Sequence, residues 1–428
     1  MIGESEIKPA NGKRQLIGES EIKPANGKRQ LTGGWQCARL GKLCTVVSGS
    51  TPSTLVPGYW NGDIAWVTPA DLGKLTLPHI RVTERSISSD GLASCGAQMV
   101  PPGTVVMSSR APIGHLAVAA VPCCTNQGCK SFIPGDSVDT WFLYFALKDS
   151  VPELRALGSG ATFTEISKSA VEAFEILLPS LSEQKRIAAI LNEQTAEAER
   201  ARAATEVQLE AAKALPSAYL RGVFSSSEVQ NWGSKPLGDV CELLPSKSIA
   251  SDGDTKVLAI TTACLTEAGF QPSGVKTARM WARDAAECVV SPGEVLIARS
   301  NTPELVGRVA MFAGAPYGAV ASDLTIRLRT KDGVMAAYLA AYLSSLYATG
   351  YWKERAGGAS GSMKKITRSQ IQDEQVPVPS EAEQRRLTAM LSDQMAAAEK
   401  TRKALEAQLA TINKLPAALL RRAFSGEL

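Results

Sequence analysis

The residue types that most often catalyse reactions are scarce in this chain of 428 residues. His79 and His115 are its only histidines, and both stand among apolar or turn residues. We therefore expect them to be packed or solvated rather than to act as general bases. The tightest cysteine cluster, at 123, 124 and 129, has no CxxC pair and no neighbouring histidine, so a zinc site is not expected. The odd total of nine cysteines favours reduced thiols over a disulfide framework.

Two glycine-rich segments could contact a phosphate group. They read GSGATFTEIS at 158–167 and GGASGSMKKIT at 357–367. Neither has the GxxxxGK(S/T) pattern or the strand–loop–helix context of a nucleotide site. Their small polar and basic side chains instead suit phosphate contact with insertion into a groove, although exposed turns with solvated lysines are an equal alternative. These side chains are Thr162, Thr164 and Lys168 in the first segment, and Ser360, Ser362, Lys364, Lys365 and Arg368 in the second.

Each loop belongs to one of two segments of similar size, at roughly 35–179 and 235–378, whose sequences resemble each other weakly. In both, a Pro-Gly pair precedes an apolar run that ends at an arginine, which matches Arg110 with Arg299. A short strand, an apolar helical stretch, the glycine-rich loop and a last strand follow. The expected strands cover 130–133 and 324–328, and the expected helical stretches cover 140–147 and 335–346. Short strands with few helices predict an α+β domain.

Both segments are followed by a copy of one helical repeat. Residues 179–225 and 379–425 align without a gap and are identical at 23 of 47 positions. Strong helix formers dominate both copies, and Ser180 or Ser182 in the first and Ser380 in the second can cap the helix start. Neither expected helix contains Gly or Pro until Pro216 or Pro416, where we expect a new short helix to begin.

Apolar residues recur along both copies with a period near 3.5 residues, which is typical of a coiled coil. The seam consists of Leu391, Met395, Ala398, Leu405, Leu409 and Ile412 in the second copy, and of Leu191, Ala198, Leu209 and Ala212 in the first. Arg202 and Arg402 interrupt it at one shared position, and a polar seam residue often fixes register or partner. The shared register favours pairing of the two copies over two independent amphipathic helices.

The first 33 residues are predicted to form a mobile arm. IGESEIKPANGKRQL, at 2–16, recurs unchanged at 17–31 and contains too few large apolar residues to offset chain entropy. Alternatively, the arm could touch nucleic acid through its basic residues, Lys13, Arg14, Lys28 and Arg29.

The composition is that of an ordinary globular protein, with 44% apolar and 21% charged residues. There is no run of about 18 apolar residues, and the polar start does not read as a signal peptide. We expect a cytoplasmic protein that does not bind a membrane. The net charge of +4 is too small to indicate nucleic-acid binding by itself.

Taken together, these patterns resemble the specificity subunit of type I restriction-modification systems. The segments that carry the resemblance are SGSTPS (48–53), YWNGDIAWVTPADL (59–72), SSRAPIG (108–114), TNQG (125–128), LLPSLSEQKRIAAIL (177–191) and LPAALLRRAFSGEL (415–428). The resemblance covers residues 35–428 and rests on the combination of motifs with the doubled domain–helix layout. The second domain departs from the pattern, with DGDTKVLAITTACL at 252–265 and no TNQG, so its contact residues are harder to name.

The resemblance implies an α+β fold in which two pseudo-symmetric target recognition domains are separated by two long antiparallel helices forming a coiled-coil rod. The implied regions are the arm at 1–33, the first target recognition domain at 34–179, the first spacer helix at 180–225, a linker at 226–234, the second target recognition domain at 235–379 and the second spacer helix at 380–428.

The resemblance also implies a function. Each domain would read one half of a split site in double-stranded DNA, and the chain would dock two modification (methyltransferase) subunits and two restriction (motor-nuclease) subunits. S-adenosylmethionine, ATP and Mg are expected in those partners, and no cofactor is expected in this chain. Catalysis is not expected either, because no Asn-Pro-Pro-Tyr or Asp-Pro-Pro-Tyr methyltransferase motif, no Walker motif and no nuclease cluster is visible.

Arginine commonly reads guanine, and Asn and Gln commonly read adenine. On that basis the candidates in the first domain are Ser108, Ser109, Arg110, Asn126, Gln127, Lys130, Thr162, Thr164 and Lys168. The candidates in the second domain are Arg299, Ser300, Asn301, Arg308, Lys364, Lys365 and Arg368. The turn at 126–128 and Arg110 could instead be structural. The alternative function is a two-lobed assembly scaffold without DNA contact, whereas a self-contained enzyme is disfavoured by the missing motifs.

Overall fold

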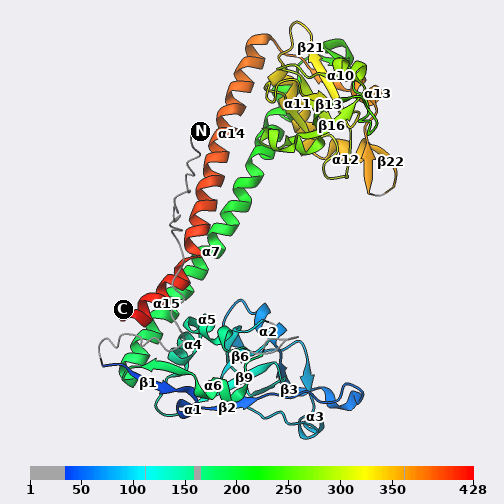
Figure 1. The fold of residues 1–428 in the computed structure, drawn as a ribbon. Coiled ribbons are helices and arrows are strands. Elements are labelled where there is room, and N and C mark those ends of the chain that lie inside the picture. Colours follow the sequence, from blue (N-terminus) through cyan, green and yellow to red (C-terminus); the bar gives the residue numbers. More distant parts are fainter. Residues whose placement is uncertain (1–33, 111, 159–164, 361) are drawn as a thin grey trace, which may run out of the picture. The chain divides into compact units, whose positions relative to one another are not determined.

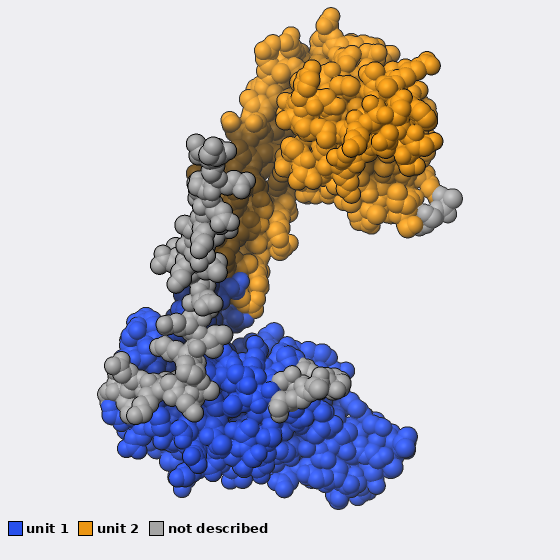
Figure 2. Space-filling view, in the orientation of Figure 1, with its two compact units in different colours: residues 1–201, 412–428 blue, residues 202–411 orange. Residues whose placement is uncertain are grey.

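The computed structural model describes residues 34–110, 112–158, 165–360 and 362–428. The chain forms two compact units: unit 1 comprises residues 1–201 with 412–428, and unit 2 comprises residues 202–411 (Figure 2). The predicted arm at 1–33, with its four basic residues, lies outside the described residues, and so do Thr162, Thr164 and the side chain of Ser360.

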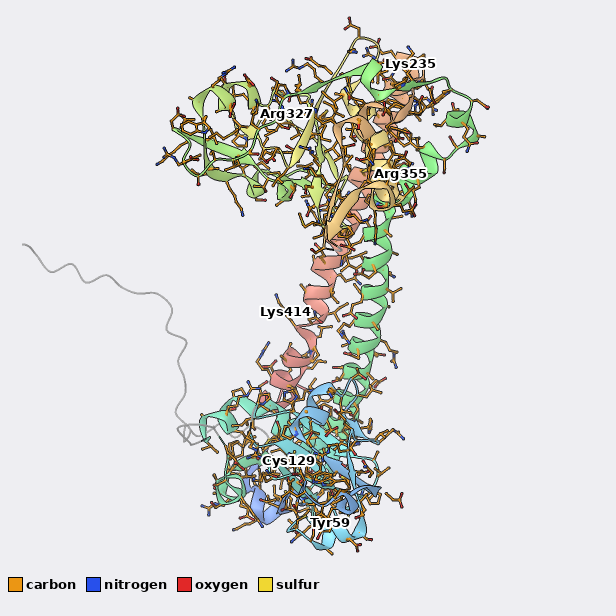
Figure 3. The ribbon with its side chains drawn as sticks, turned by 90° about the vertical axis from the view of Figure 1, so that its right-hand side faces the viewer. Tyr59, Cys129, Lys235, Arg327, Arg355 and Lys414 are labelled. Atoms are coloured by element: carbon orange, nitrogen blue, oxygen red, sulfur yellow. The ribbon has the colours of Figure 1, made fainter. Side chains whose placement is uncertain are left out.

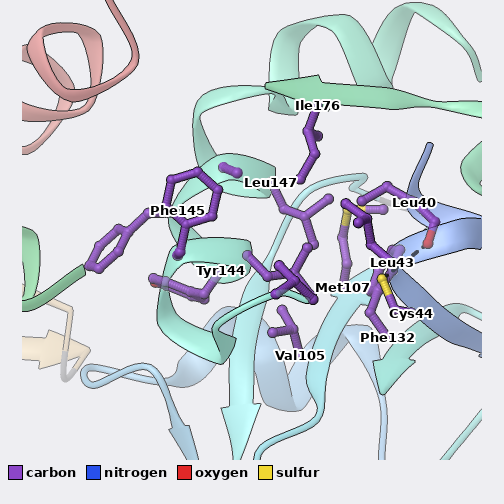
Figure 4. Close-up of a cluster of buried hydrophobic side chains, with 14 of the residues drawn as sticks. Leu40, Leu43, Cys44, Val105, Met107, Phe132, Tyr144, Phe145, Leu147 and Ile176 are labelled. Carbon is purple, nitrogen blue, oxygen red and sulfur yellow. Dashed lines mark hydrogen bonds between the residues drawn. The ribbon is translucent and has the colours of Figure 1, made fainter. Parts of the chain in front are cut away.

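A five-stranded sheet in the order β2-β9-β6-β7-β4 forms the centre of unit 1. Its strands are β2 (Cys44–Ser48), β4 (His79–Ile80), β6 (Val105–Ser108), β7 (Leu116–Ala119) and β9 (Cys129–Pro134). Every residue of β6 is buried because both faces of the sheet are covered. Val105 and Met107 pack against Phe145 and Leu147 of helix α4 (Thr140–Asp149) on one face (Figure 4), while Val106 joins a second cluster on the other. This alternation is the two-residue period of a strand.

Smaller elements complete unit 1. A second sheet has the order β5-β3-β8, and an antiparallel pair, β1 with β10, joins the two ends of the domain just before the long helix. These strands are β1 (Gln36–Arg39), β3 (Trp60–Val67), β5 (Ser86–Ile87), β8 (Cys123–Thr125) and β10 (Glu175–Leu178), and the short helices are α1 (Leu40–Leu43), α2 (Pro69–Lys74), α3 (Ser89–Ala93), α5 (Val151–Ala156) and α6 (Lys168–Ala173).

Unit 2 repeats the same topology. Its sheet β12-β21-β17-β19 corresponds to β2-β9-β6-β7, its sheet β16-β13-β20 corresponds to β5-β3-β8, and its pair β11-β24 corresponds to β1-β10. Unit 2 also has the pair β14-β15 and the three-stranded sheet β18-β23-β22, whose place in unit 1 is marked by the bridge between Arg110 and Glu165 at the edge of the described residues. The strands are β11 (Ser234–Pro236), β12 (Cys241–Leu244), β13 (Thr255–Ile260), β14 (Leu265–Thr266), β15 (Gly269–Phe270), β16 (Lys276–Met280), β17 (Val295–Ala298), β18 (Ser300–Asn301), β19 (Val309–Met311), β20 (Val320–Ala321), β21 (Thr325–Thr330), β22 (Gly357–Ser360), β23 (Met363–Lys365) and β24 (Gln375–Pro377).

The helices of unit 2 outside the helical repeat are α8 (Ser227–Gln230), α9 (Leu237–Val240), α10 (Ala282–Cys288), α11 (Ala336–Ala348), α12 (Tyr351–Arg355) and α13 (Arg368–Gln372). The strands and helical stretches expected around 130, 324, 140 and 335 are therefore confirmed to within about two residues. Together the two units confirm the predicted α+β class and its internal repetition.

The two cores differ at one pair of equivalent positions. In unit 2, Glu294 and Arg327 are almost completely buried and form an ion pair of 2.9 Å. Arg327 also donates to the carbonyl oxygens of Pro245, Glu287 and Val289, which satisfies its guanidinium. The strand register places Thr104 and Ser131 at the equivalent positions of unit 1. Unit 2 thus has a buried charge network where unit 1 has two neutral hydroxyl residues, of which Thr104 donates to the carbonyl oxygen of Pro101.

The helical repeat forms the three remaining helices. They are α7 (Leu181–Phe224), α14 (Glu381–Ile412) and α15 (Leu415–Ser425). The 44 residues of α7 span about 66 Å at 1.5 Å per residue. Ser180 and Ser380 cap the two starts, because each hydroxyl accepts a hydrogen bond from the backbone N–H of the glutamate three residues later.

The two prolines of the repeat behave differently. Pro416 lies in the first turn of α15, as predicted, but the expectation for Pro216 is wrong because α7 runs through it without a break. Proline removes one helical hydrogen bond and crowds the preceding turn, which usually ends a helix. The first copy has Lys213 where the second has Asn413, and Lys is the better helix former. Ala212 and Leu220, on either side of Pro216, are buried and hold this stretch of α7 against unit 2.

Within unit 2, the second half of α7 runs antiparallel to α14, and the two helices lie side by side (Figures 1 and 3). Seven of the ten predicted seam residues are buried, namely Leu191, Ala198, Leu209 and Ala212 in the first copy and Leu391, Ala398 and Ile412 in the second. The other three, Met395, Leu405 and Leu409, are partly buried. Arg202 and Arg402 at the shared polar position are half-buried, and each pairs with a glutamate of its own helix. These ion pairs neutralise the guanidinium groups beside the seam.

A buried glutamine fastens each long helix to its own domain. The Gln184 amide oxygen accepts from the backbone N–H of Asp139 at 2.8 Å, and its nitrogen donates to the carbonyl oxygens of Ser137 and Pro179. Gln384 makes the same three bonds, to Met335, Gly333 and Pro379. Both glutamines are at most 1% exposed, so each repeat begins at a fixed place on α4 or α11.

Replacing Gln384 by Ala should lower the free energy of unfolding of unit 2 by about 1–3 kcal/mol, because one buried N–H and two carbonyl groups lose their partner. A urea titration monitored by hydrogen exchange and mass spectrometry measures the unfolding of each unit separately. Gln408→Ala, at an exposed position of the same helix, is the matched control and should change stability by less than about 0.5 kcal/mol. Equal effects of the two substitutions would contradict the fastening role.

Candidate functional site

The polar candidates of unit 1 gather where β6 ends and β9 begins. The Lys130 ammonium lies 3.4 Å from the Ser109 hydroxyl and 3.3 Å from a Glu165 carboxylate oxygen, and an Arg110 guanidinium nitrogen lies 3.9 Å from the other oxygen of Glu165. We call Ser109, Arg110, Lys130 and Glu165 the unit 1 basic site. The Lys130 side chain is 5% exposed and that of Arg110 is 33% exposed. Glu165, whose side chain is 38% exposed, therefore compensates a buried ammonium group, and solvent reaches both Glu165 and Arg110.

The TNQG segment forms a tight turn beside this site. The Asn126 side-chain oxygen accepts from the backbone N–H of Gly128, whereas Gln127 is exposed and accepts a hydrogen bond from the Thr51 hydroxyl. Gly49 has no room for a side chain, because a Cβ there would lie 2.1 Å from the carbonyl oxygen of Asn126. The SGSTPS and TNQG motifs thus fit together through backbone contact. Asn126 holds the turn, and Gln127 projects from it.

Two other candidates of unit 1 have local partners. Ser108 is completely buried, donates to the carbonyl oxygen of Pro112 and accepts from the backbone N–H of His115, so it shapes the 108–115 loop. Lys168 opens α6, is half exposed and lies 3.6 Å from Glu172 one turn later.

In unit 2 most candidates gather on or beside the sheet β18-β23-β22. Ser300 and Asn301 form β18, where they pair with Lys365 and Lys364 of β23. Arg299, just before β18, donates to the carbonyl oxygen of Asp323 at 3.3 Å. Arg368 opens α13 and donates to the carbonyl oxygens of Leu243 and Leu244, at 2.7 and 3.0 Å. We call Arg299, Lys364, Lys365 and Arg368 the unit 2 basic site.

The charges of this second site are not balanced within the part of the chain that the structure describes. None of its four cations forms an ion pair within 4.0 Å with a described carboxylate. Burial and the positive charge of Arg299 both lower the pKa of Arg368 from its usual value. The two guanidinium groups are thus close enough to repel each other, in contrast to unit 1, where Glu165 stands between two cations.

Arg308 lies apart from the other candidates of unit 2. Its guanidinium donates to the Tyr347 hydroxyl at 3.3 Å and to the carbonyl oxygen of Leu265 at 3.4 Å, and it lies 3.9 Å from Glu267. It lines a hollow beside α7 and α14 rather than the unit 2 basic site.

The structure corrects the matching of Arg110 with Arg299. The backbone N–H of Ile166 donates to the carbonyl oxygen of Ser109, and the equivalent N–H of Ile366 donates to the carbonyl oxygen of Arg299. Strand pairing agrees, because Met107 faces Lys130 as Ile297 faces Ile326. Arg299 therefore occupies the place of Ser109, and Ser300 the place of Arg110. A count without a gap from the Pro-Gly pairs at 102–103 and 292–293 gives the same correspondence, so matching the two segments on their arginines was wrong by one residue.

Two residues of the unit 1 site escaped sequence reasoning. Glu165 is not among the candidates named from the sequence, because only the folded chain places it opposite Lys130 and Arg110. Thr51 belongs to the SGSTPS motif and hydrogen bonds Gln127 across 76 residues of chain. Nothing in the local pattern around Thr51 indicates that contact.

Each unit also contains one hollow at the equivalent place beside the helical repeat, of about 620 Å³ in unit 1 and about 850 Å³ in unit 2. The repeat contributes Ala196, Glu199 and Pro416 to the first, and Ala396, Glu399 and Pro216 to the second. Both histidines line the unit 1 hollow, where the ring of His79 packs edge-on against Trp141.

All nine cysteines lie in described parts of the chain, and all are free thiols, as the odd count predicts. Burial raises the pKa of Cys44 and Cys129 to about 12, so these thiols stay protonated. In the ranges that the structure covers, no helix is both long and apolar enough to cross a membrane, and no group of three or more His, Cys, Asp or Glu side chains could hold a metal ion.

Comparison with known proteins gives a consistent result. The family model described as type I restriction modification DNA specificity domain matches the chain twice, at residues 32–208 and 229–409. The MjaIX specificity subunit of Methanocaldococcus jannaschii is 38% identical over 160 residues, or 37% of this chain and 37% of that protein. The EcoKI specificity subunit of Escherichia coli is 24% identical over 358 residues, covering 78% of this chain and 76% of that protein. The chain thus covers little more than a third of the MjaIX subunit but most of the EcoKI subunit.

Solved structures share the fold. The HsdS subunit of Thermoanaerobacter tengcongensis superposes with a TM-score of 0.63 at 20% identity, over 94% of this chain and 100% of that one. A chain from a type I R-M system, solved in work on complex assembly and conformational transition, gives a TM-score of 0.70 at 20% identity, over 93% and 100%. Because the family model accounts for most of the chain in two successive copies, the protein belongs to the type I restriction modification DNA specificity family, whose matched relatives are named specificity subunits.

Proposed function

We propose that this chain directs a type I restriction-modification complex to DNA by reading a split two-part duplex target, one half with each unit. The observation that carries the proposal is the repeated geometry. Both units have the same strand order, and in both the basic and amide candidates lie at the same end of equivalent strands, β6 and β17. Separate sites on separate units suit a target whose two halves are separate.

The solvent-facing candidates fit base recognition. Arg110 is a third exposed and Gln127 is exposed, and these side chains are the usual readers of guanine and adenine in the major groove. The Arg110 side chain passes close to the backbone of Gly128, where a larger residue would crowd it, because a Cβ at Gly128 would lie 3.0 Å from the Arg110 Nε and from Pro69. A side chain oriented in this way loses less entropy when it contacts a base.

Docking of partner subunits is supported by the two hollows. They lie at equivalent places and are lined by equivalent residues from the two copies of the helical repeat, so a partner that fits one would fit the other. We infer that two copies of the modification subunit bind there and supply S-adenosylmethionine, and that the restriction subunits supply ATP and Mg chemistry. On this proposal the complex acts in the cytoplasm, and this chain contributes recognition and assembly.

Binding of DNA by the purified specificity–modification complex tests the proposal. Mapping methylated adenines in cells with and without this gene defines the target. Affinity for that duplex should then exceed affinity for a scrambled duplex and fall as salt rises, because phosphate contacts release counterions. Salt-independent binding, or equal affinity for both duplexes, would favour an assembly scaffold without DNA reading.

Arg110→Ala should weaken binding by about 1–3 kcal/mol on the target and relax discrimination at one base pair of one half-site. Arg200→Ala, on an exposed face of α7 with a side chain that is 73% exposed, removes the same charge and should leave discrimination unchanged. Titration against duplexes substituted at each position measures both effects. Unaltered discrimination in the Arg110 variant would remove Arg110 from the base readers.

Exchanging residues 34–179 for the matching domain of a relative should change one half of the methylated target and leave the other half and the spacing as they were. The reciprocal exchange of 235–379 should change only the other half. Each outcome follows from separate cores, since each unit has its own buried clusters. A single exchange that alters both halves would show that the two units do not read independently.

A further inference from the structure

Equivalent backbone positions in the two units carry opposite charges. The backbone of Glu165 forms a β-bridge with Arg110 in unit 1, and the backbone of Lys365 pairs in the same way with Ser300 in unit 2. The next residue, Ile166 or Ile366, donates its N–H to Ser109 or Arg299, which fixes the correspondence. The same place in the fold is therefore a carboxylate in one unit and an ammonium group in the other.

In unit 1 that carboxylate neutralises its surroundings. One oxygen of Glu165 lies 3.3 Å from Lys130 and the other lies 3.9 Å from Arg110. An incoming phosphate would have to displace Glu165 and would meet its negative charge at short range. Such a site is suited to a directional contact with a base and disfavours a second anion.

In unit 2 the charges add. The two guanidinium groups are held by backbone carbonyl oxygens of Asp323, Leu243 and Leu244, which orient them without cancelling their charge. The Nε of Arg299 is buried and has no hydrogen-bond partner in the described part of the chain. Burial and the nearby charge of Arg299 lower the pKa of Arg368. Two oriented guanidinium groups that repel each other would gain stability from an anion between or beside them.

The lysines extend this site outward. Lys365 is exposed and Lys364 is half-buried on β23, which pairs with β22 in a hairpin that stands out from the body of unit 2 (Figure 1). Solvated lysines of a simple turn would not be accompanied by two arginines that are fixed behind them. The combination of fixed guanidinium groups with exposed ammonium groups matches the backbone of a nucleic acid, where negative charges recur at regular spacing.

We propose that the unit 2 basic site binds backbone phosphate of duplex DNA, and that its counterpart in unit 1, closed by Glu165, does not. The two units then contribute unequally: unit 2 supplies phosphate contacts that hold any sequence, and the unit 1 basic site contacts bases. This inference rests on the proposed function, because it assigns different roles to the two sites of one DNA-reading chain.

The test measures the salt dependence of binding by the specificity–modification complex on three duplexes: the target and two versions in which one half-site is scrambled. Lys365→Ala should weaken binding to all three by the same factor and lower the slope of log affinity against log salt by about 1. The loss of affinity between 50 and 200 mM salt should therefore shrink about fourfold. Lys365→Glu places in unit 2 the carboxylate that Glu165 supplies in unit 1, and it should lower the slope further.

Two matched variants complete the design. Lys235→Ala removes an exposed cation elsewhere in unit 2 and should leave the slope unchanged. Glu165→Gln removes the neutralising carboxylate from unit 1 and should raise the slope by up to about 1, with tighter binding to all three duplexes. Hydrogen exchange of the free complexes identifies any variant whose unit has loosened, and Lys364→Ala then serves as the second test of the unit 2 site.

The outcomes separate the two proposals. An unchanged slope for Lys365→Ala and Lys364→Ala, or a loss confined to duplexes with an intact unit 2 half-site, would overturn the phosphate assignment while DNA reading stands. A slope that falls as much for Lys235→Ala would also overturn it, because the effect would then reflect net charge. If the unaltered complex binds none of the duplexes, the proposed function itself fails.

Discussion

The structure depends on the buried glutamine at the start of each long helix. A primary amide removed from water must satisfy its polar atoms, and Gln184 and Gln384 each do so with three backbone groups of their own domain. These bonds fix the point at which the helix leaves the domain and the rotation of the helix about its own axis. The antiparallel pairs β1-β10 and β11-β24 secure the same junction from the other side. The glutamine that stands at the same position of both copies of the repeat thus has a structural explanation.

One scaffold therefore carries two chemically different surfaces. The central sheets, the helices α4 and α11 and the glutamine bonds repeat, while the side chains at the ends of β6 and β17 do not. Even the cores differ, with Glu294 and Arg327 in place of Thr104 and Ser131. A repeated fold with divergent sites suits a protein whose two halves must recognise different targets while remaining compatible with the same partners.

Long-range periodicity could be predicted from the sequence, and contacts between distant segments could not. The 3.5-residue period located the seam because helix packing depends on regular spacing along one element. Pro216 was mispredicted because packing around Ala212 and Leu220 overrides the local preference of proline. The one-residue offset between Arg110 and Arg299 follows from a gap-free count from the two Pro-Gly pairs, and the structure confirms that count. The pairing of Glu165 with Lys130 joins segments 35 residues apart, and it appears only when the chain is folded.

On the proposed function, two independent readers are joined by a helical repeat, and we propose that this repeat sets the distance between the half-sites. Seven residues inserted after Val207 and seven after Ala407, the equivalent positions of the two copies, keep the 3.5-residue seam in phase and add about 10 Å. With a rise of about 3.4 Å per base pair, the methylated target mapped in cells should keep both half-sites and gain a spacer longer by about three base pairs. Full methylation at the original spacing, or a change in either half-site, would contradict the account.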